Sequence, residues 1–483
     1  MREKIIRLIK KYEGLSEPVK ASFWFTICNV LNKGIALLAT PIFTRMLTTE
    51  QYGDYTVFQS WYGILIIFGT CNLFIGVYGK GLVEFDKDKD KYTSSLLALT
   101  TVITIVTLVI YALNIDFWTR FLGLSPIIMT AMFIQLFTMP AYEFWTTKLR
   151  FEYKYKALIG TSIGMSVMSI LISVIAVLST SYKLEARVYS DVFVKAVVGI
   201  FIFVLLVLRG KKLFHKKYWK YALVFNIPLI PHFLSTMILN QSDRIMIKNM
   251  VDASSAAMYG IAYVIGTVVL LVTNAINNSF TPYTYQALKE NNFCGIKKNA
   301  NTLLILAASM VCVSIIFAPE IIYIFAGSNY YEAIGVIPPV SASVFFIFMY
   351  SLFSNIEYYY KKTTYISISS IICAIINVVL NYLFIPRFGY YAAGYTTLVC
   401  YILYATIHFL FCYSILKQKN IRLTDIFDIK RYVFITFFVL VVMMIMVIIY
   451  KYMIIRYSIL LSALFIAWIK KEWIIKEIKD IQR

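Results

Sequence analysis

Long apolar segments recur along almost the whole chain, and they limit its possible folds more than any other feature. Stretches of about 20 mostly apolar residues, each long enough to cross a bilayer as a helix, are separated by short polar connections. Of the 483 residues 60% are hydrophobic, and the mean hydropathy is +0.73, whereas soluble domains use about 45–50% apolar residues. We therefore expect an all-α polytopic membrane protein without a sizeable soluble domain.

The apolar runs and their polar or Gly/Pro interruptions predict about fourteen transmembrane helices. The expected spans are 19–42, 55–78, 93–114, 126–147, 157–179, 187–208, 221–247, 255–281, 300–325, 333–357, 364–385, 389–415, 432–450 and 457–469. Twelve spans are the alternative if the last pair is peripheral.

The charges of the connecting segments predict the orientation. With a cytoplasmic N-terminus, the inside segments carry 35 lysines and arginines and the outside loops carry 8. This asymmetry follows the positive-inside rule, so both termini are expected in the cytoplasm. The net charge of +21 does not indicate nucleic-acid binding, because the basic residues sit in short loops rather than on one solvated face.

An internal repeat predicts two bundles of six helices. Tyr52-Gly53 and Tyr259-Gly260 both follow an outside turn where a helix begins, and six spans separate them, as in transporters with parallel halves. The expected organisation is an N-terminal six-helix bundle, a cytoplasmic basic linker, a second six-helix bundle, and a cytoplasmic loop with two additional C-terminal helices. These regions are 1–208, 209–220, 221–415 and 416–483.

Ionisable residues inside the predicted spans are the candidate functional residues, because each costs several kcal/mol unless it faces water or a partner. Four cations fall in the outer half of the spans and would make a cavity cationic toward the outside. They are Lys33, Arg45, Lys195 and Arg244. Four carboxylates are candidates for ion coupling or gating. They are Glu143, Asp191, Asp243 and Glu357.

Membrane depth separates these cations. Lys33 lies about 20 Å from the start of its helix, beside Asn29 and Asn32, which favours exposure to a cavity. Arg45 and Arg244 lie near helix ends, where the alternative is that a long basic side chain reaches the headgroups.

Motifs for other chemistry are missing from the sequence. It contains no G-x-x-x-x-G-K-[ST] loop, no H-E-x-x-H and no nucleophile elbow, and its seven cysteines are scattered without metal-like pairing. We expect no cofactor and no metal site, so energy must come from an ion gradient or the substrate gradient. His232 follows Pro228 and Pro231, which should break the seventh span, but proton coupling through His232 is the less favoured interpretation.

Three segments resemble the bacterial polysaccharide-unit flippases of the multidrug/oligosaccharidyl-lipid/polysaccharide superfamily. Residues 41–53 read PIFTRMLTTEQYG, similar to the P-x-x-T-R-x-L-x-x-x-x-Y-G that ends the first span of these flippases. NIPLIPH at 226–232 with SDR at 242–244, and NYLFIPRFG at 381–389, resemble them too. The resemblance covers residues 15–415; many members have twelve spans, so fourteen is a departure.

This resemblance implies a transporter, not an enzyme, in the bacterial inner (cytoplasmic) membrane. It implies alternating-access transfer of an undecaprenyl-pyrophosphate-linked oligosaccharide from the inner to the outer leaflet, for O-antigen of lipopolysaccharide or for capsule. Pyrophosphate binds basic side chains through charge-assisted bonds, so Lys33, Arg45, Lys195 and Arg244 are the predicted substrate-binding residues. The coupling ion, H+ or Na+, stays open, as do a polysaccharide polymerase and a chain-length regulator as partners beside the membrane lipids.

Two other functions fit the hydropathy. A membrane polysaccharide polymerase would usually carry a large outside loop, but the longest outside loops here, around 41–54 and 115–125, hold one basic residue each. An ion-coupled multidrug exporter of the same superfamily would favour buried carboxylates with few cavity cations. The excess of cations in the outer half favours the flippase.

Overall fold

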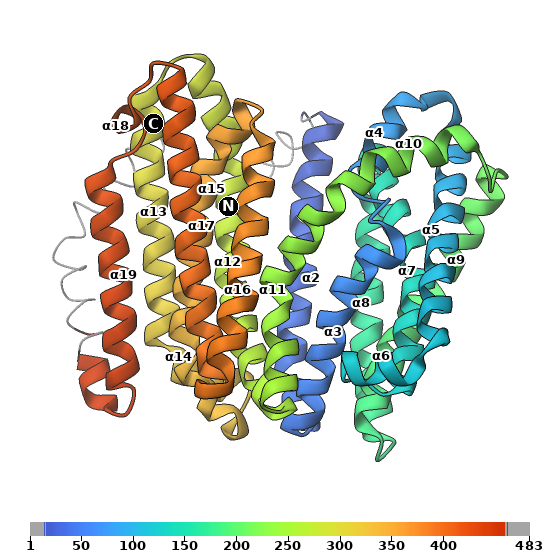
Figure 1. The fold of residues 1–483 in the computed structure, drawn as a ribbon, viewed down its shortest axis with the longest axis horizontal. Helices are drawn as coiled ribbons and strands as arrows, with labels where there is room; N and C mark the ends of the chain where they lie inside the picture. Colours follow the sequence, from blue (N-terminus) through green and yellow to red (C-terminus); the bar gives the residue numbers. More distant parts are fainter. Residues whose placement is uncertain (1–13, 15, 459–460, 462–483) are drawn as a thin grey trace, which may run out of the picture. The chain divides into compact units, whose positions relative to one another are not determined.

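A computed structural model describes residue 14, residues 16–458 and residue 461, and every regular element in this part of the chain is a helix (Figure 1). The all-α fold is therefore as predicted. The chain divides into two compact units, with the boundary between Met237 and Ile238. The predicted division at the basic linker 209–220 stays a prediction.

Unit 1 is built around one central helix. Its elements are α2 (Glu17–Met46), α3 (Thr49–Thr70), α4 (Val77–Glu84), η1 (Asp86–Asp88), α5 (Lys89–Leu113), α6 (Ile115–Leu122), α7 (Pro126–Phe151), α8 (Tyr155–Leu178), α9 (Lys183–Gly210), α10 (Lys216–Asn226), η2 (Ile227–Leu229) and the start of α11 (Ile230–Met250). In α7, 72% of the most apolar window is buried, against 17% in α2 and in α8. The apolar core therefore gathers on α7, while α2 and α8 leave most of their surface uncovered within the unit.

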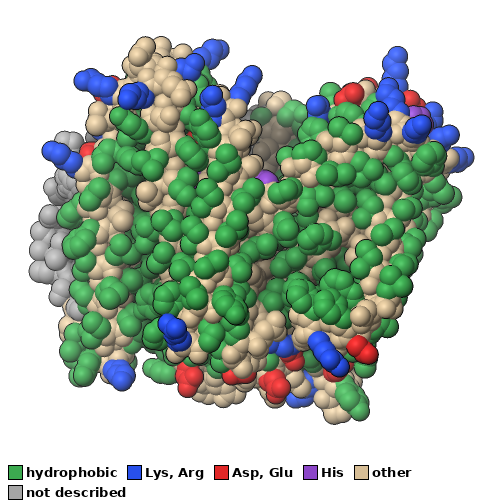
Figure 2. All heavy atoms as spheres, in the orientation of Figure 1, with side chains coloured by type: hydrophobic (Ala, Val, Ile, Leu, Met, Phe, Trp, Pro, Cys, Tyr) green, Lys and Arg blue, Asp and Glu red, His purple; other side chains and the backbone are tan. Residues whose placement is uncertain are grey.

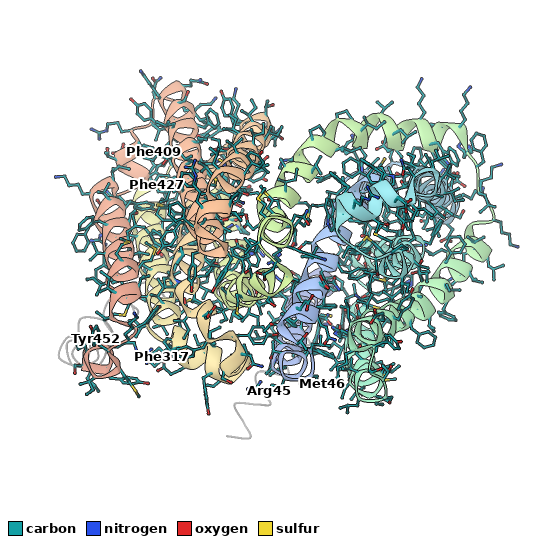
Figure 3. The ribbon with its side chains drawn as sticks, turned by 60° about the horizontal axis from the view of Figure 1, so that its bottom comes forward. Arg45, Met46, Phe317, Phe409, Phe427 and Tyr452 are labelled. Atoms are coloured by element: carbon teal, nitrogen blue, oxygen red, sulfur yellow. The ribbon has the colours of Figure 1, made fainter. Side chains whose placement is uncertain are left out.

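Unit 2 repeats this plan around α15. Its elements are the rest of α11, α12 (Ala253–Lys289), α13 (Phe293–Ile316), α14 (Ala318–Phe325), η3 (Ser328–Gly335), α15 (Ile337–Tyr359), α16 (Thr363–Phe388), α17 (Tyr390–Gln418), α18 (Leu423–Ile426) and α19 (Ile429–Ile449). The window of α15 is 78% buried. Phe353 of α15 packs edge-on against Phe409 and Phe427, which Figure 3 labels in the same part of the unit.

The two units share a short helix at the same place in the chain order. In unit 1, α6 stands between α5 and the central α7; in unit 2, α14 stands between α13 and the central α15, and both short helices have eight residues. This shared order supports the predicted internal repeat. The two Tyr-Gly pairs also lie near the starts of α3 and α12, where Thr48 and Asp252 cap the helices.

Fewer helices than the fourteen predicted are long and apolar enough to count as membrane spans in the described part of the chain. Twelve described helices are long and apolar enough to cross a membrane, with α10, η2 and α11 counted together. α3 has 22 residues but is not among the twelve. The expected last span, 457–469, falls largely outside the described residues, so fourteen spans are not confirmed.

Three predicted spans are interrupted. The span predicted at 55–78 ends as a helix at Thr70 and resumes at Val77; Cys71, Asn72 and Gly76 between them have positive φ values of 49°, 48° and 76°. The Asn226 side chain donates to the carbonyls of Cys71 and Asn72, at 2.9 and 2.8 Å. Buried backbone groups need hydrogen bonds. The Asn226 amide therefore gives these two carbonyls the donors that a continuous helix would have given them.

The other interruptions occur at prolines. The span predicted at 221–247 changes at Pro228 into the 3-10 turn η2, as the sequence predicted, since proline removes a backbone donor. The helix in the span predicted at 300–325 ends at Ile316. The separate α14 begins at Ala318, with Pro319 in its first turn.

The surface of each unit has the character expected in a bilayer. Hydrophobic side chains cover the sides of the helices, while lysines, arginines and carboxylates gather toward the helix ends (Figure 2). Exposed apolar residues on outward faces include Leu171, Ile175, Phe201 and Val204. Such continuous apolar exposure is costly in water and expected in lipid. The protein is a multi-pass membrane protein.

Candidate functional site

A row of charged residues on α9 forms the first candidate site. Arg187, Asp191 and Lys195 follow one another at intervals of four residues, so they share one face of the helix. Lys195 Nζ lies 2.7 Å from Asp191 Oδ2, and Ser169 of α8 donates a further hydrogen bond to Asp191. The sequence predicted Asp191 and Lys195 as functional residues, and the structure brings them together as an ion pair.

Arg187 extends this row and was not among the predicted residues. Its Nη1 donates to Ser173 Oγ at 3.0 Å and its Nη2 to Tyr55 Oη at 2.8 Å. The guanidinium carbon lies 4.0 Å from the ring centre of Phe43 and 4.5 Å from that of Tyr55. Two aromatic faces therefore hold a cation that is only 6% exposed. Arg187 is the first residue of the predicted span 187–208, and this place at a helix boundary gave no signal of a buried charge.

We name Arg187, Asp191 and Lys195 the α9 cluster. Its two cations outnumber its one carboxylate, and Lys195 keeps 21% of its side chain exposed whereas Asp191 is buried. A cluster with a net positive charge and one accessible ammonium group can accept an anion, because the ligand would replace water rather than a second protein carboxylate.

Asp243 of α11 forms the second candidate site, in unit 2. Its side chain is fully buried and accepts hydrogen bonds from three neutral groups: Asn381 Nδ2 at 2.6 Å, Thr397 Oγ1 at 2.9 Å, and the Tyr259 hydroxyl. These partners come from α16, α17 and α12. The carboxylate thus links four helices, and we name it with its three partners the Asp243 cluster.

Further amide and hydroxyl groups lie next to this cluster. Asn377 Nδ2 donates to Thr397 Oγ1 at 3.3 Å, and Ser242 Oγ donates to Asn377 Oδ1 at 3.3 Å. Carboxylate, amide and hydroxyl oxygens are the ligands that hard cations prefer. The described hydrogen-bond donors to Asp243 are neutral, and the neighbouring Arg244 interacts with it electrostatically. Such a buried carboxylate favours a cation or a proton beside it, because a buried charge is costly.

Arg244 follows Asp243 in the chain but has other partners. Its guanidinium carbon lies 4.3 Å from the ring centre of Tyr263, and its side chain donates to Gln241. Arg244 is 8% exposed. The guanidinium of Arg244 is therefore packed on a ring, and its predicted role in substrate binding stays a prediction.

Glu357 occupies a third site, in the core of unit 2. Both Glu357 and His408 are fully buried, with His408 Nδ1 2.8 Å from Glu357 Oε1 and Nε2 3.1 Å from Ser369 Oγ. The Ser369 hydroxyl donates to the Tyr365 carbonyl at 2.6 Å. Because that hydroxyl has a single hydrogen, it accepts from Nε2–H, which leaves one proton shared between Nδ1 and Glu357. Sequence reasoning named Glu357 and missed His408, which lies in an apolar run without a neighbouring charge.

The remaining predicted residues stand apart from these clusters. Lys33 is exposed on α2 and makes no hydrogen bond or ion pair within the described part of the chain. Its neighbour Asn32 donates to Ser162 Oγ and accepts from Ser166 Oγ, both at 2.7 Å. Arg45 is exposed at the end of α2 (Figure 3), where it donates to the Pro41 carbonyl at 2.8 Å. Glu143 is half-buried on the central α7.

Comparison with known families identifies the chain. The family model described as polysaccharide biosynthesis protein matches residues 19–288, more than half of the sequence, and the MatE model matches residues 228–383. A curated relative, Lsg locus putative protein 1 of Haemophilus influenzae, is 23% identical over 381 residues, which cover 74% of this chain and 89% of that protein.

Solved structures of low sequence identity share the fold. Lipid II flippase MurJ in an inward closed conformation is 15% identical, with a TM-score of 0.66 over 93% of this chain and 99% of that one. An inward-facing MATE multidrug resistance transporter of the MOP superfamily is also 15% identical, with a TM-score of 0.64 over 80% of this chain and 95% of that one. These two neighbours are a flippase and a transporter, and they share the fold of this chain. The chain belongs to the family described as polysaccharide biosynthesis protein.

Proposed function

We propose that this chain, as a member of the polysaccharide biosynthesis protein family, flips an undecaprenyl-pyrophosphate-linked oligosaccharide across the bacterial cytoplasmic membrane. The transfer runs from the inner to the outer leaflet and supplies O-antigen or capsule, with both termini in the cytoplasm. The observation that carries the proposal is the cation excess of the α9 cluster in a chain of this family. A drug or cation exporter has no evident need for such a cluster.

The pyrophosphate is the part of this cargo that the protein can hold most strongly. Lys195 offers an accessible ammonium group, and the buried Arg187 adds a second positive charge on the same helix face. Lys33, Arg45 and Arg244 remain further proposed contacts. Charge-assisted hydrogen bonds to phosphate oxygens are about twice as strong as neutral ones, so a few such contacts are enough to select an anionic lipid.

The transport cycle that we propose is alternating access by two bundles, which cover 1–208 and 221–415 and are joined by the linker 209–220. Repeated bundles of this kind expose a binding site to one side of the membrane at a time. The lipid tail stays in the bilayer while the charged head crosses within the protein.

Asp243 is the proposed site of ion coupling. A Na+ ion or a proton would neutralise its buried carboxylate, and the surrounding amide and hydroxyl oxygens would complete the coordination of Na+. Binding would then depend on how the four helices that meet at Asp243 are arranged, which is the condition for coupling an ion to a conformational change.

Deleting the gene in its host tests the function. Complete lipid-linked units should accumulate on the cytoplasmic face while surface polysaccharide disappears. Accumulation of complete but unpolymerised units on the outer face would overturn the proposal, as would unchanged surface glycan.

One observation favours a multidrug exporter as the second candidate. The MatE model matches residues 228–383, the region that contains the buried Asp243 and Glu357. Deletion would then raise drug sensitivity and leave surface glycan unchanged, so the same experiment separates the two functions.

A further inference from the structure

We propose that α10 carries a binding site for an anionic phospholipid, with the phosphate at Lys217 and Lys220 and an acyl chain along Val224 and Phe225. This site goes beyond the proposed transport, because its ligand is a lipid of the surrounding membrane and not the cargo.

A groove on unit 1 supplies the space for this lipid. Its volume is about 440 Å³, and its lining residues are Lys217, Lys220, Tyr221, Val224 and Phe225. The lysines precede the apolar residues by one to two helical turns, which separates the charged and apolar ends of the groove by about 10 Å. A glycerophospholipid has the same order, with an anionic phosphate above an acyl chain.

The opposite face of α10 fixes the groove in place. Tyr218, Ala222 and Asn226 recur every four residues and are buried. The neighbouring Trp219 donates from Nε1 to the Ser95 carbonyl at 3.0 Å, and the Asn226 side chain bonds to the break after α3. The side chains of α10 that line the groove therefore belong to a helix whose opposite face is packed against the rest of unit 1.

The charge around the groove is mainly positive, with Glu84 as the carboxylate that faces the lining residue Tyr221. Lys80 of α4 reaches toward the groove, with Nζ 5.1 Å from the ring centre of Phe225. Within the described ranges, none of Lys80, Lys217 and Lys220 makes an ion pair with a carboxylate. Each basic residue near a membrane surface contributes about 1 kcal/mol of attraction to anionic lipids.

Apolar residues beside the lysines point to a lipid rather than to a soluble anionic protein. Leu213 and Phe214, just before α10, are 54% and 60% exposed, and Val224 and Ile227 are 66% and 52% exposed. A helix with lysines and exposed apolar side chains on one face is typical of segments that lie in the membrane interface.

Native mass spectrometry of the full-length protein tests this site. Phosphatidylglycerol and phosphatidylcholine with identical acyl chains are titrated separately. We expect phosphatidylglycerol to bind at least about tenfold more tightly, and the double variant Lys217→Gln/Lys220→Gln to lose most of that preference. The control Lys211→Gln/Lys212→Gln removes the same charge outside the groove and should keep it.

Two further measurements complete the test. Val224→Ser should weaken both phospholipids by a similar, smaller factor, because it removes acyl-chain contact. Equal binding of the two phospholipids by the native protein would overturn the proposal, and so would an equal loss in the control variant. Preferential binding of undecaprenyl diphosphate over phosphatidylglycerol would also overturn it. All these measurements read lipid binding, so they are independent of whether the chain flips its proposed cargo.

Discussion

The α9 cluster and the Asp243 cluster occupy units with the same plan but differ in how their charges are satisfied. In unit 1, a carboxylate pairs with one cation while a second cation is held by aromatic rings and hydroxyl groups. In unit 2, a fully buried carboxylate has only neutral donors on its oxygens. The first arrangement has two cations around one carboxylate, whereas the second has neutral hydrogen-bond donors and one neighbouring cation, Arg244, around its carboxylate.

This difference is the basis for proposing different tasks for the two units. The central helices α7 and α15 and the short helices α6 and α14 provide similar frames. The proposed anion site lies on α9, late in unit 1, whereas the proposed cation site lies on α11, at the start of unit 2. The predictions below alter the side chains of these sites one unit at a time.

The largest effect is expected at Asp243. Asp243→Ala removes the acceptor of three buried donors and should lower the free energy of unfolding by about 3 kcal/mol or more. Thermal unfolding of the detergent-purified protein, followed by intrinsic fluorescence, measures it. The matched variant Asp243→Asn keeps an acceptor oxygen and should lose less stability.

The effect of Na+ on the unfolding temperature tests the proposed role of Asp243 further. If Na+ binds at Asp243, NaCl should raise the unfolding temperature of the native protein relative to choline chloride, since ligands of the folded state stabilise it. Asp243→Asn should abolish that rise. An identical rise in both proteins would exclude Asp243 as the Na+ site, and the absence of any rise would leave the proton as the proposed coupling ion.

The next effect concerns the Glu357–His408 pair. A double-mutant cycle with Glu357→Gln and His408→Gln should give a coupling free energy of about 1.5–3 kcal/mol, because both side chains are buried and share a proton. The exposed pair Arg422–Asp425 is a control in the same unit, with an expected coupling below about 0.5 kcal/mol. Similar coupling in the two cycles would contradict the assigned pairing.

In unit 1, substitutions in the α9 cluster should reduce transport more than they reduce the stability of the protein. Lys195→Gln should reduce flipping about tenfold by removing the accessible cation of the α9 cluster. Arg187→Lys keeps the charge but loses the planar guanidinium between two rings, so it should also reduce flipping. Surface polysaccharide measured at equal membrane levels of protein reports the effect; Lys183→Gln on the same helix is the control and should behave as the native protein does.

The smallest effects are expected at the isolated cations. Lys33→Ala and Arg244→Ala should each lower surface polysaccharide by a few fold while leaving membrane insertion intact, since each would remove one of several anion contacts. Full polysaccharide in both single variants and in the double variant would remove these residues from the proposed substrate site.

The sequence predicted the helical fold and the family because each depends on patterns along the chain, while the internal repeat stays a prediction. Apolar length identified most spans, and proline identified the change at Pro228. The break at residues 71–76 escaped prediction because Asn226, more than 150 residues away, satisfies its carbonyls. That partner becomes apparent only when the helices pack.

The sequence also predicted only part of the candidate sites, namely the charges and the contacts within one helix. Asp191 and Lys195 pair within one helix, four residues apart, so their spacing already favours contact. Asp243 was recognised as a charge inside a span, but its partners Asn381 and Thr397 are neutral residues from distant helices. Neutral partners leave no signal in hydropathy or charge, and His408 was missed for a similar reason.

The length of α12 has a consequence for the membrane in which the protein can work. Its 37 residues extend over about 55 Å, whereas the hydrocarbon core of a bilayer is about 30 Å thick. The helix must tilt or project well into the aqueous phase. Changes in bilayer thickness would alter how much of α12 is solvated, so acyl-chain length should be a physical variable to which this protein responds.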